Sequence, residues 1–217
     1  MASTAKQHKP SAADFLPARL TLPAMKKAVQ ACRGCDLCCQ PGVTQAVFGE
    51  GPESATCVMV GEQPGDTEDR AGRPFVGPAG QLLDELMDEA GVNRREVYVT
   101  NAVKHFRFEL VGQRRIHAKP LARHVNACRP WFEAEARVLQ PKMVVALGST
   151  AAQAIMGRNF RVTRDRGKVT SCPYAPWFLA TIHPSAILRI PDDAARHEAK
   201  AAFVQDMRTV ARRLKTG

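Results

Sequence analysis

Four short runs of mainly apolar residues divide the chain, and polar or glycine-rich segments bound each of them. Apolar runs of this length, without polar alternation, indicate strands that are buried on both faces. We expect these strands at Cys57–Val60, Val97–Asn101, Met143–Leu147 and Trp177–Ile182.

Segments with helical spacing of apolar residues separate these runs. We expect helices at 81–90, at about 120–139, at 150–156 and after Asp192-Asp193, the last with Phe203, Met207, Val210 and Leu214 on one face. A short helix at Pro23–Ala31 and a short strand at Gln45–Phe48 are also expected. Buried strands that alternate with helices predict an α/β fold, with a central four-stranded parallel sheet covered on both faces.

Polar residues directly follow three of the expected strands, where ligands bind in parallel sheets. These residues are Gly61-Glu62-Gln63, Asn101 and His183. The loop Gly61–Gly80 adds glycines, which let a ligand approach the backbone closely, and one aromatic ring, Phe75. Because this loop is acidic, it favours an uncharged planar ligand such as a nucleobase over a nucleoside triphosphate. An ordinary strand-to-helix connection is the alternative interpretation.

The length of 217 residues suits a single domain. We place that domain at 23–217, after a flexible tail at 1–22 that mixes Lys, Ser, Ala and Pro without periodicity. Lys and Arg total 31 against 21 Asp and Glu, and the net charge of +10 favours a polyanionic partner. A solvated basic surface would give the same balance. No apolar run reaches the ~20 residues that span a bilayer, and no signal peptide is recognisable, so we expect a cytoplasmic protein without membrane contact.

Seven cysteines in such a protein indicate metal binding or core packing rather than disulfides. Cys32 and Cys35 form a Cys-x2-Cys pair, whose spacing lets two thiolates reach one metal centre. Cys38 continues this spacing in the manner of a ferredoxin, so Cys38 or the adjacent Cys39 is a further candidate ligand.

Two other segments carry chemistry that suits a nucleic acid. The arginine-rich segment at 104–120 suits phosphate contact, although a solvated basic loop is the alternative. After the last strand, Ser185 precedes an apolar turn that ends in Leu188 and Arg189. An apolar tip can enter a base stack while a neighbouring arginine contacts phosphate. A helical turn with buried Ile187 and Leu188 is the alternative here.

Several of these motifs occur together, in this order, in one known family. They are Gly61-Glu62-Gln63-Pro64-Gly65-Asp66, Gly72-Arg73-Pro74-Phe75-Val76-Gly77, Asn101-Ala102-Val103-Lys104 and His183-Pro184-Ser185. The chain thereby resembles the uracil-DNA glycosylase superfamily, and most closely its iron–sulfur family 4. Arg114-Arg115-Ile116-His117 resembles the UdgX-like subgroup. The resemblance implies a three-layer α/β/α sandwich that flips uracil out of DNA into a pocket.

The resemblance also implies roles for individual residues. Phe75 would stack on the flipped base, and the amide of Asn101 would read its Watson–Crick edge. His183 would lie near uracil O2, where a donor stabilises the charge that develops as uracil leaves. For His183 alone, the alternative is a structural hydrogen bond at the end of a strand. Ser185, Leu188 and Arg189 are placed with Phe75 and Asn101 among the substrate-binding residues.

The UdgX-like segment implies that His117 attacks the cationic sugar carbon in place of water. The protein would then stay covalently attached to the abasic sugar after one turnover. We expect Glu62 or Asp66 to orient His117 and keep its reactive nitrogen unprotonated. Gln63 is expected to shape the pocket, and Arg115 to position the segment and contact the substrate.

Family 4 relatives carry a four-iron, four-sulfur (4Fe-4S) cluster on four cysteines, and the resemblance implies the same cofactor here. Cys32, Cys35 and Cys128 match three of these ligands. His105 occupies the remaining position, as in UdgX-like proteins, and is our candidate fourth ligand, since histidine also binds Rieske clusters. Cys38 or Cys39 is the alternative ligand, and zinc on the same four residues is chemically possible.

These implications predict an enzyme that acts on uracil-containing DNA as a monomer and prefers single strands. A conventional family 4 glycosylase that turns over by hydrolysis is the enzymatic alternative. A non-catalytic iron–sulfur module that binds DNA is the alternative from another class, because charge and cysteines suffice for it.

Overall fold

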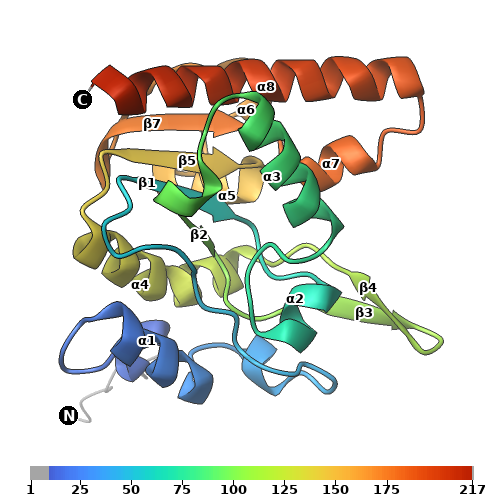
Figure 1. Ribbon diagram of the computed structural model, residues 1–217. Helices are drawn as coiled ribbons and strands as arrows, with labels where there is room; N and C mark the ends of the chain where they lie inside the picture. Colours follow the sequence, from blue (N-terminus) through green and yellow to red (C-terminus); the bar gives the residue numbers. More distant parts are fainter. Residues whose placement is uncertain (1–9, 217) are drawn as a thin grey trace, which may run out of the picture.

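A five-stranded sheet runs through the centre of the computed structural model, which describes residues 10–216 (Figure 1). Four strands pair in parallel, and the short fifth strand pairs antiparallel at one edge. In spatial order they are β2 (Val97–Asn101), β1 (Cys57–Gly61), β5 (Met143–Leu147), β7 (Ala175–Thr181) and β6 (Thr170–Cys172). The four predicted parallel strands are confirmed, and β6 is an addition that the sequence pattern did not indicate.

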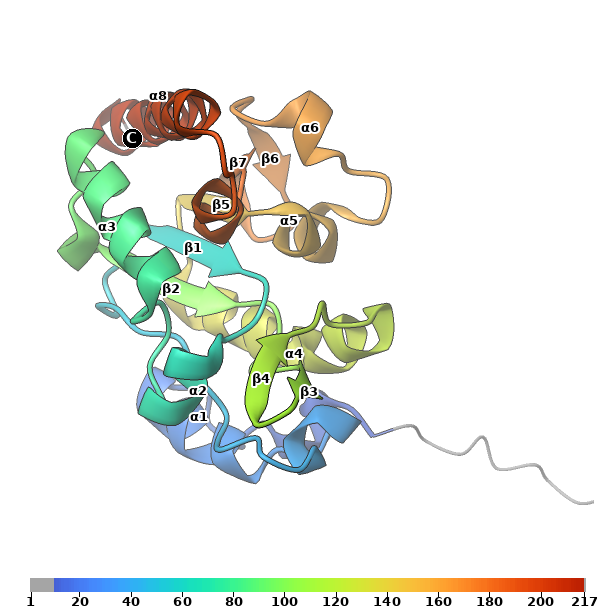
Figure 2. The same cartoon turned by 90° about the vertical axis from the view of Figure 1, so that its right-hand side faces the viewer.

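Side chains alternate between the two faces of the sheet, which puts a separate core on each face. On β1, Val58 and Val60 join the core under one layer of helices, and Cys57 and Met59 join the core under the other layer. The first layer contains α1 (Leu22–Ala28), α4 (Ala122–Leu139), α5 (Ser149–Met156) and α6 (Val162–Asp165). The second contains α3 (Pro78–Glu89), α7 (Pro184–Leu188) and α8 (Asp193–Thr216). The two layers are seen on either side of the sheet in Figure 2, and they confirm the three-layer α/β/α sandwich.

The N-terminal region is folded further toward the start of the chain than predicted. Of the tail expected at 1–22, residues 1–9 lie outside the described part of the chain. The 3-10 turn η1 (Ala12–Phe15) buries Ala12 in the core that α4 covers. The helix expected at Pro23–Ala31 is present as α1 followed by η2 (Val29–Ala31). The folded domain therefore begins before residue 23.

One other local prediction needs correction. The segment at 45–48 is not a strand: the backbone N–H of Val47 donates to Lys104 O, and the isolated bridge to Val99 is formed by Glu50. Helix α4 covers the range expected at about 120–139 and continues through Pro130. No helix among residues 10–216 combines the length and apolar character that a membrane crossing requires.

The arginine-rich segment forms a two-stranded hairpin rather than a loop. Its strands are β3 (Phe108–Val111) and β4 (Arg114–His117). The hairpin projects from the body beside the short helix α2 (Asp66–Ala71), near the carboxyl ends of the parallel strands (Figures 1 and 2). The turns η3 (Asp36–Cys39) and η4 (Arg94–Glu96) complete the described elements.

Candidate active site

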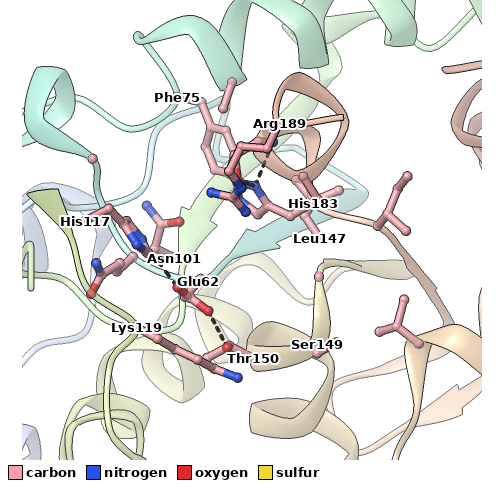
Figure 3. Close-up of a pocket in the computed structure, with 18 of the residues that line it drawn as sticks. Glu62, Phe75, Asn101, His117, Lys119, Leu147, Ser149, Thr150, His183 and Arg189 are labelled. Atoms are coloured by element: carbon pink, nitrogen blue, oxygen red, sulfur yellow. Dashed lines mark hydrogen bonds and ion pairs between the residues drawn. The ribbon is translucent and has the colours of Figure 1, made fainter. Parts of the chain in front are cut away.

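A pocket of about 710 Å³ opens at the carboxyl ends of the parallel strands (Figure 3). Its lining includes Glu62 after β1, Asn101 at the end of β2, His117 at the end of β4 and His183 after β7. Phe75 reaches the same pocket from the loop before α3. The fold therefore brings together five residues that the sequence analysis selected from separate segments.

Phe75 presents its ring to the pocket from an unusual backbone conformation. Its φ of 56° lies in the left-handed region, which bulky residues rarely adopt. Gly80 permits this conformation, because a Cβ there would lie 1.8 Å from Phe75 O. Such a backbone persists only where the surrounding structure enforces it, and it frequently marks a functional site.

The amide of Asn101 lies against the glycine that ends β1. A Cβ on Gly61 would lie 2.3 Å from Asn101 Oδ1 and 2.7 Å from Phe75 Cζ. Glycine is therefore required for the amide and the ring to converge at this point. The Asn101 side chain lines the pocket, so its amide is available to a ligand.

His183 is held in one tautomer by the start of α7. The backbone N–H of Ser185 donates to His183 Nδ1 at 3.1 Å, so Nδ1 is an acceptor and the proton of the neutral ring is on Nε2. Burial, helped by the positive charge of Arg189 and by the neighbouring His117, lowers the pKa of His183 to about 4. The neutral ring therefore offers one N–H donor, at Nε2.

His117 reaches the pocket mouth and faces a carboxylate there. Its Nε2 lies 3.4 Å from Glu62 Oε1, and the other Glu62 oxygen accepts a hydrogen bond from Thr150 Oγ1. Partial burial lowers the pKa of His117, and the cations Arg189 and Arg107 add to this effect against the opposing pull of Glu62. The imidazole is thus uncharged near neutral pH and retains a basic nitrogen.

Gln63 anchors the base of the hairpin that carries His117. Its Nε2 donates to Arg107 O at 3.0 Å and to Ala118 O at 3.2 Å, and its Oε1 accepts from Arg107 N at 3.2 Å. These atoms belong to the residues directly before β3 and after β4. Gln63 therefore positions His117 in addition to lining the pocket.

Arg115 is turned back onto α2 and does not line the pocket. Its guanidinium donates to Asp66 at 2.5 Å and to Asp69 at 2.6 Å, and it lies over the rings of Phe106 and Phe108. Its side chain is only 8% exposed. This corrects the expectation that Arg115 contacts the substrate, because its donors are already engaged.

These contacts distinguish Glu62 from Asp66, the two carboxylates considered for orienting His117. Asp66 binds Arg115 and Arg70, whereas Glu62 faces His117. Glu62 is therefore the carboxylate that orients His117, and Asp66 fixes the hairpin through Arg115.

Helix α7 forms the opposite side of the pocket mouth. Ser185 and Arg189 line the pocket, while Leu188 is exposed beside them. The alternative interpretation of this turn, in which both Ile187 and Leu188 are buried, is confirmed for Ile187 and is wrong for Leu188.

Three further residues of the site carried no usable sequence signal. Thr150 binds Glu62 from the start of α5, and Lys119 joins the lining after β4. Glu68 accepts from Gly65 N at 3.1 Å and from Gly77 N at 2.7 Å, which ties together the ends of the loop that presents Phe75. Only the folded chain shows these pairings.

The candidate cluster ligands converge beside the hairpin. Burial raises the pKa of Cys128 to about 12 against the opposing effect of Lys104, and the nearby thiols of Cys35 and Cys32 add smaller increases. Cys128 Sγ accepts from Lys104 N at 3.2 Å, and Cys32 Sγ accepts from Trp131 Nε1 at 3.4 Å. These sulfurs are sheltered and soft, and they fit an iron–sulfur cluster.

His105 is buried next to the same cysteine loop. Burial and the neighbouring Arg33 lower its pKa to about 4, which keeps the ring neutral as metal ligation requires. Within residues 10–216, no three His, Cys, Asp or Glu side chains are arranged to hold a metal ion.

Cys38 and Cys39 occupy a different position in the cysteine loop. Their sulfurs lie 3.0 Å apart, and Cys38 donates to Cys35 O at 3.1 Å. Cys39 is exposed and Cys38 is half-buried, as is Cys35, whereas His105 is buried. The buried position of His105 favours it over the exposed Cys39 as the fourth ligand.

Comparison with known proteins agrees with the motifs and the fold. The family described as the uracil DNA glycosylase superfamily matches residues 48–208. A type-4 uracil-DNA glycosylase of Thermotoga maritima is 35% identical, covering 76% of this chain and 82% of the relative. A type-4 uracil-DNA glycosylase of Pyrobaculum aerophilum is also 35% identical, covering 77% of this chain and 86% of the relative. For that of Sulfurisphaera tokodaii, also 35% identical, the shares are 79% and 78%.

Proposed function

This chain belongs to the uracil-DNA glycosylase superfamily, and on that premise we propose that it excises uracil from DNA and captures the abasic sugar on His117. One observation carries the proposal. The half-exposed imidazole of His117 enters the pocket of Phe75, Asn101 and His183, and it lies 3.4 Å from Glu62. A nucleophile thus faces the site in which a base would be bound.

The buried end of the pocket suits a flipped uracil. The Phe75 ring provides a stacking surface, and the Asn101 amide supplies one donor and one acceptor. Uracil and cytosine exchange donors and acceptors along the Watson–Crick edge, so an oriented amide distinguishes them. Gly61 makes room for this amide, because a Cβ at that position would lie 2.3 Å from Asn101 Oδ1.

His183 suits stabilisation of the leaving uracil. When the bond between uracil N1 and sugar C1′ breaks, its electron pair moves onto uracil and the charge is shared with O2. The Nε2–H of His183 is a neutral donor in a buried position, and a preorganised donor is most effective for charge that develops during the reaction. His183 therefore lowers the barrier to departure without first having to lose a proton.

His117 suits capture of the sugar that remains. Loss of uracil leaves a positive charge on C1′, and the lone pair of one imidazole nitrogen forms a new bond to that carbon. The other nitrogen then releases its proton, with Glu62 as the nearest acceptor, and the uracil anion gains a proton. The product is a neutral N-alkylated imidazole, which is a poor leaving group, so the protein acts once.

The proposal is tested with a uracil-containing single-stranded oligonucleotide and a denaturing gel. A slower protein–DNA band that withstands denaturant, together with one uracil released per protein, is the expected result. Released uracil and a labile abasic strand without this band would instead support a hydrolytic glycosylase. Binding without uracil release would support the non-catalytic module.

Hydrolytic turnover is the second candidate function. It is favoured by the relatives named type-4 uracil-DNA glycosylase and by the Glu62–Thr150 pair, whose oxygens suit the binding of a water molecule. In this mechanism His117 would stay unmodified, and uracil release would exceed the amount of protein.

We also propose that a 4Fe-4S cluster is bound by Cys32, Cys35, Cys128 and His105. Such a cluster would supply a rigid cross-link between the cysteine loop, α4 and the end of β2, close to the base of the hairpin. We further propose that the protein acts as a monomer on single strands. The hairpin projects from the body beside α2 (Figure 2), and His117 at its end lines the pocket, so a second DNA strand would have to pass the hairpin.

The change His183→Asn is expected to slow uracil release by ~10²–10³-fold, as loss of one preorganised donor does. Asparagine is also a good N-cap, so the start of α7 is retained. Single-turnover release of uracil measures the effect. His197→Asn, on the exposed face of α8, is the matched control with an unchanged rate. A His183→Asn rate within tenfold of the unmodified protein would contradict the role of His183.

The change His105→Ala is expected to lower cluster occupancy, since one of four ligands is lost. Iron content and absorbance in the visible range measure the occupancy in the purified protein. Cys38→Ser and Cys39→Ser serve as comparisons and are expected to retain the cluster. The opposite pattern, with loss in Cys38→Ser or Cys39→Ser and retention in His105→Ala, would transfer the fourth-ligand role to that cysteine.

A further inference from the structure

Exposed large apolar side chains are most frequent on the β3–β4 hairpin. Among residues 10–216 the large hydrophobic residues with high exposure are Leu110, Val111, Ile116, Leu121 and Leu188. Three of them belong to the β3–β4 hairpin, one precedes α4 directly after it, and one lies on α7. Exposed apolar surface that gathers in one region marks an interaction site rather than random exposure.

The register of the hairpin separates its two faces. Phe108 pairs with His117, and because Phe108 is buried this pair lies on the face toward the body. Side chains alternate along each strand, so the neighbouring pairs lie on the opposite face. We call this the outer face; it consists of Glu109, Val111, Arg114 and Ile116. Val111 is 64% exposed and Ile116 is 40% exposed on this face.

The outer face is presented by a fixed scaffold. Gln63 binds the residues at both ends of the hairpin, and Arg115 ties its inner face to Asp66 and Asp69. These bonds fix the hairpin on the body and leave Val111 and Ile116 exposed.

Charge and position indicate what the outer face binds. Arg114 adds a cation beside the two aliphatic side chains, and the carboxylate of Glu109 lies 3.8 Å from Arg107, which offsets its charge. Ile116 directly precedes His117 and points to the opposite face of β4, so the outer face lies across this strand from the point where the sugar of a flipped nucleotide would lie. Flipping leaves the neighbouring base without its stacking partner. Aliphatic side chains commonly cover such a base.

We propose that the outer face binds the nucleotide adjacent to the flipped uracil in a single strand, with Val111 and Ile116 against its base and Arg114 at its phosphate. This inference rests on the proposed function for the position of the uracil. The hairpin thereby recognises DNA as well as delivering His117.

The test uses 2-aminopurine placed on the 5′ or the 3′ side of uracil in a short single strand. A 2′-fluorine on the uracil nucleotide destabilises the cationic sugar and blocks cleavage, so binding is measured at equilibrium. The unmodified protein is expected to change the fluorescence on one side of uracil. V111S/I116S is expected to lose that change and to bind at least ~5-fold more weakly, as loss of one stacking contact does.

Leu121→Ser is the matched control. It removes an apolar side chain with 39% exposure outside the hairpin and leaves serine, a good N-cap, before α4. Its affinity is expected to stay within ~2-fold of the unmodified protein. Arg114→Gln is expected to reduce the slope of log affinity against log salt by about one.

Unchanged affinity and fluorescence in V111S/I116S would overturn the proposal, as would equal signals from both sides of uracil. Loss of a dimer in sedimentation, with DNA binding intact, would show that the outer face binds a second copy instead. A protein that binds in the expected manner but releases no uracil from unfluorinated DNA would refute the proposed function and leave the outer face as a DNA-binding surface.

Discussion

His117→Ser is expected to abolish the covalent adduct while uracil release continues. A neutral serine hydroxyl is a far weaker nucleophile than imidazole, so the cationic sugar would react with water. Phe75, Asn101 and His183 are untouched, and base binding and departure are retained. The adduct should fall from one per protein to none, and uracil released per protein should rise above one.

The measurement combines a denaturing gel with counting of released uracil. His197→Ser, an exposed histidine on α8, is the control and should form the full amount of adduct. An adduct that survives His117→Ser would remove His117 from the mechanism. A complex with processed DNA in which His117 faces solvent and the sugar is unmodified would do the same.

Lys104→Met is expected to lower the free energy of unfolding by about 3–5 kcal/mol, which is the usual effect of breaking a buried ion pair. Lys104 Nζ lies 2.7 Å from Glu135 Oε2, and both side chains are 0% exposed. Tyr98, Thr100 and Gly49 also donate to Glu135. Removal of the lysine leaves the carboxylate buried with only neutral partners.

Urea unfolding followed by circular dichroism measures this change. Lys27→Met, on the exposed side of α1, is the control and should stay within about 0.5 kcal/mol. The double change Lys104→Met with Glu135→Gln should recover part of the loss, because glutamine removes the charge and keeps an acceptor oxygen. A loss below about 1 kcal/mol in Lys104→Met would contradict this account of the pair.

Lys104 also connects the site to the candidate cluster. Its Nζ donates to Asn101 O at 3.1 Å, while its backbone N–H donates to Cys128 Sγ. A local shift at Lys104 would therefore affect both the amide that faces the base and one cluster ligand. The buried pair thus stabilises the fold at the place where the proposed base-reading amide and a candidate cluster ligand meet.

The parallel strands were predictable because each is buried on both faces and needs a nearly continuous apolar run. Strand β6 (Thr170–Cys172) was missed because an exposed edge strand imposes no such pattern. Helix α2 (Asp66–Ala71) was missed for a related reason. Its residues are mostly polar, and the ion pairs of Asp66 and Asp69 with Arg115 stabilise it.

The hairpin was interpreted as a loop because its charge concealed a short alternation. Had β4 been recognised as a strand, Arg115 and His117 would have been placed on one face, since they are two residues apart. That placement would have shown that the two side chains turn toward the body together. It would not have shown that one meets α2 and the other meets the pocket.

The sequence alone determined the order of buried strands, the family and the residues available for base binding, because apolar runs and local motifs depend on near neighbours in the chain. Only the tertiary structure decided which carboxylate faces His117, which tautomer His183 adopts and why Arg115 is unavailable to a ligand. Each of these depends on atoms from distant segments, as when Thr150 on α5 fixes the Glu62 that follows β1. Such pairings arise from the packing of the sheet, the hairpin and the helices against one another, and no local pattern encodes them.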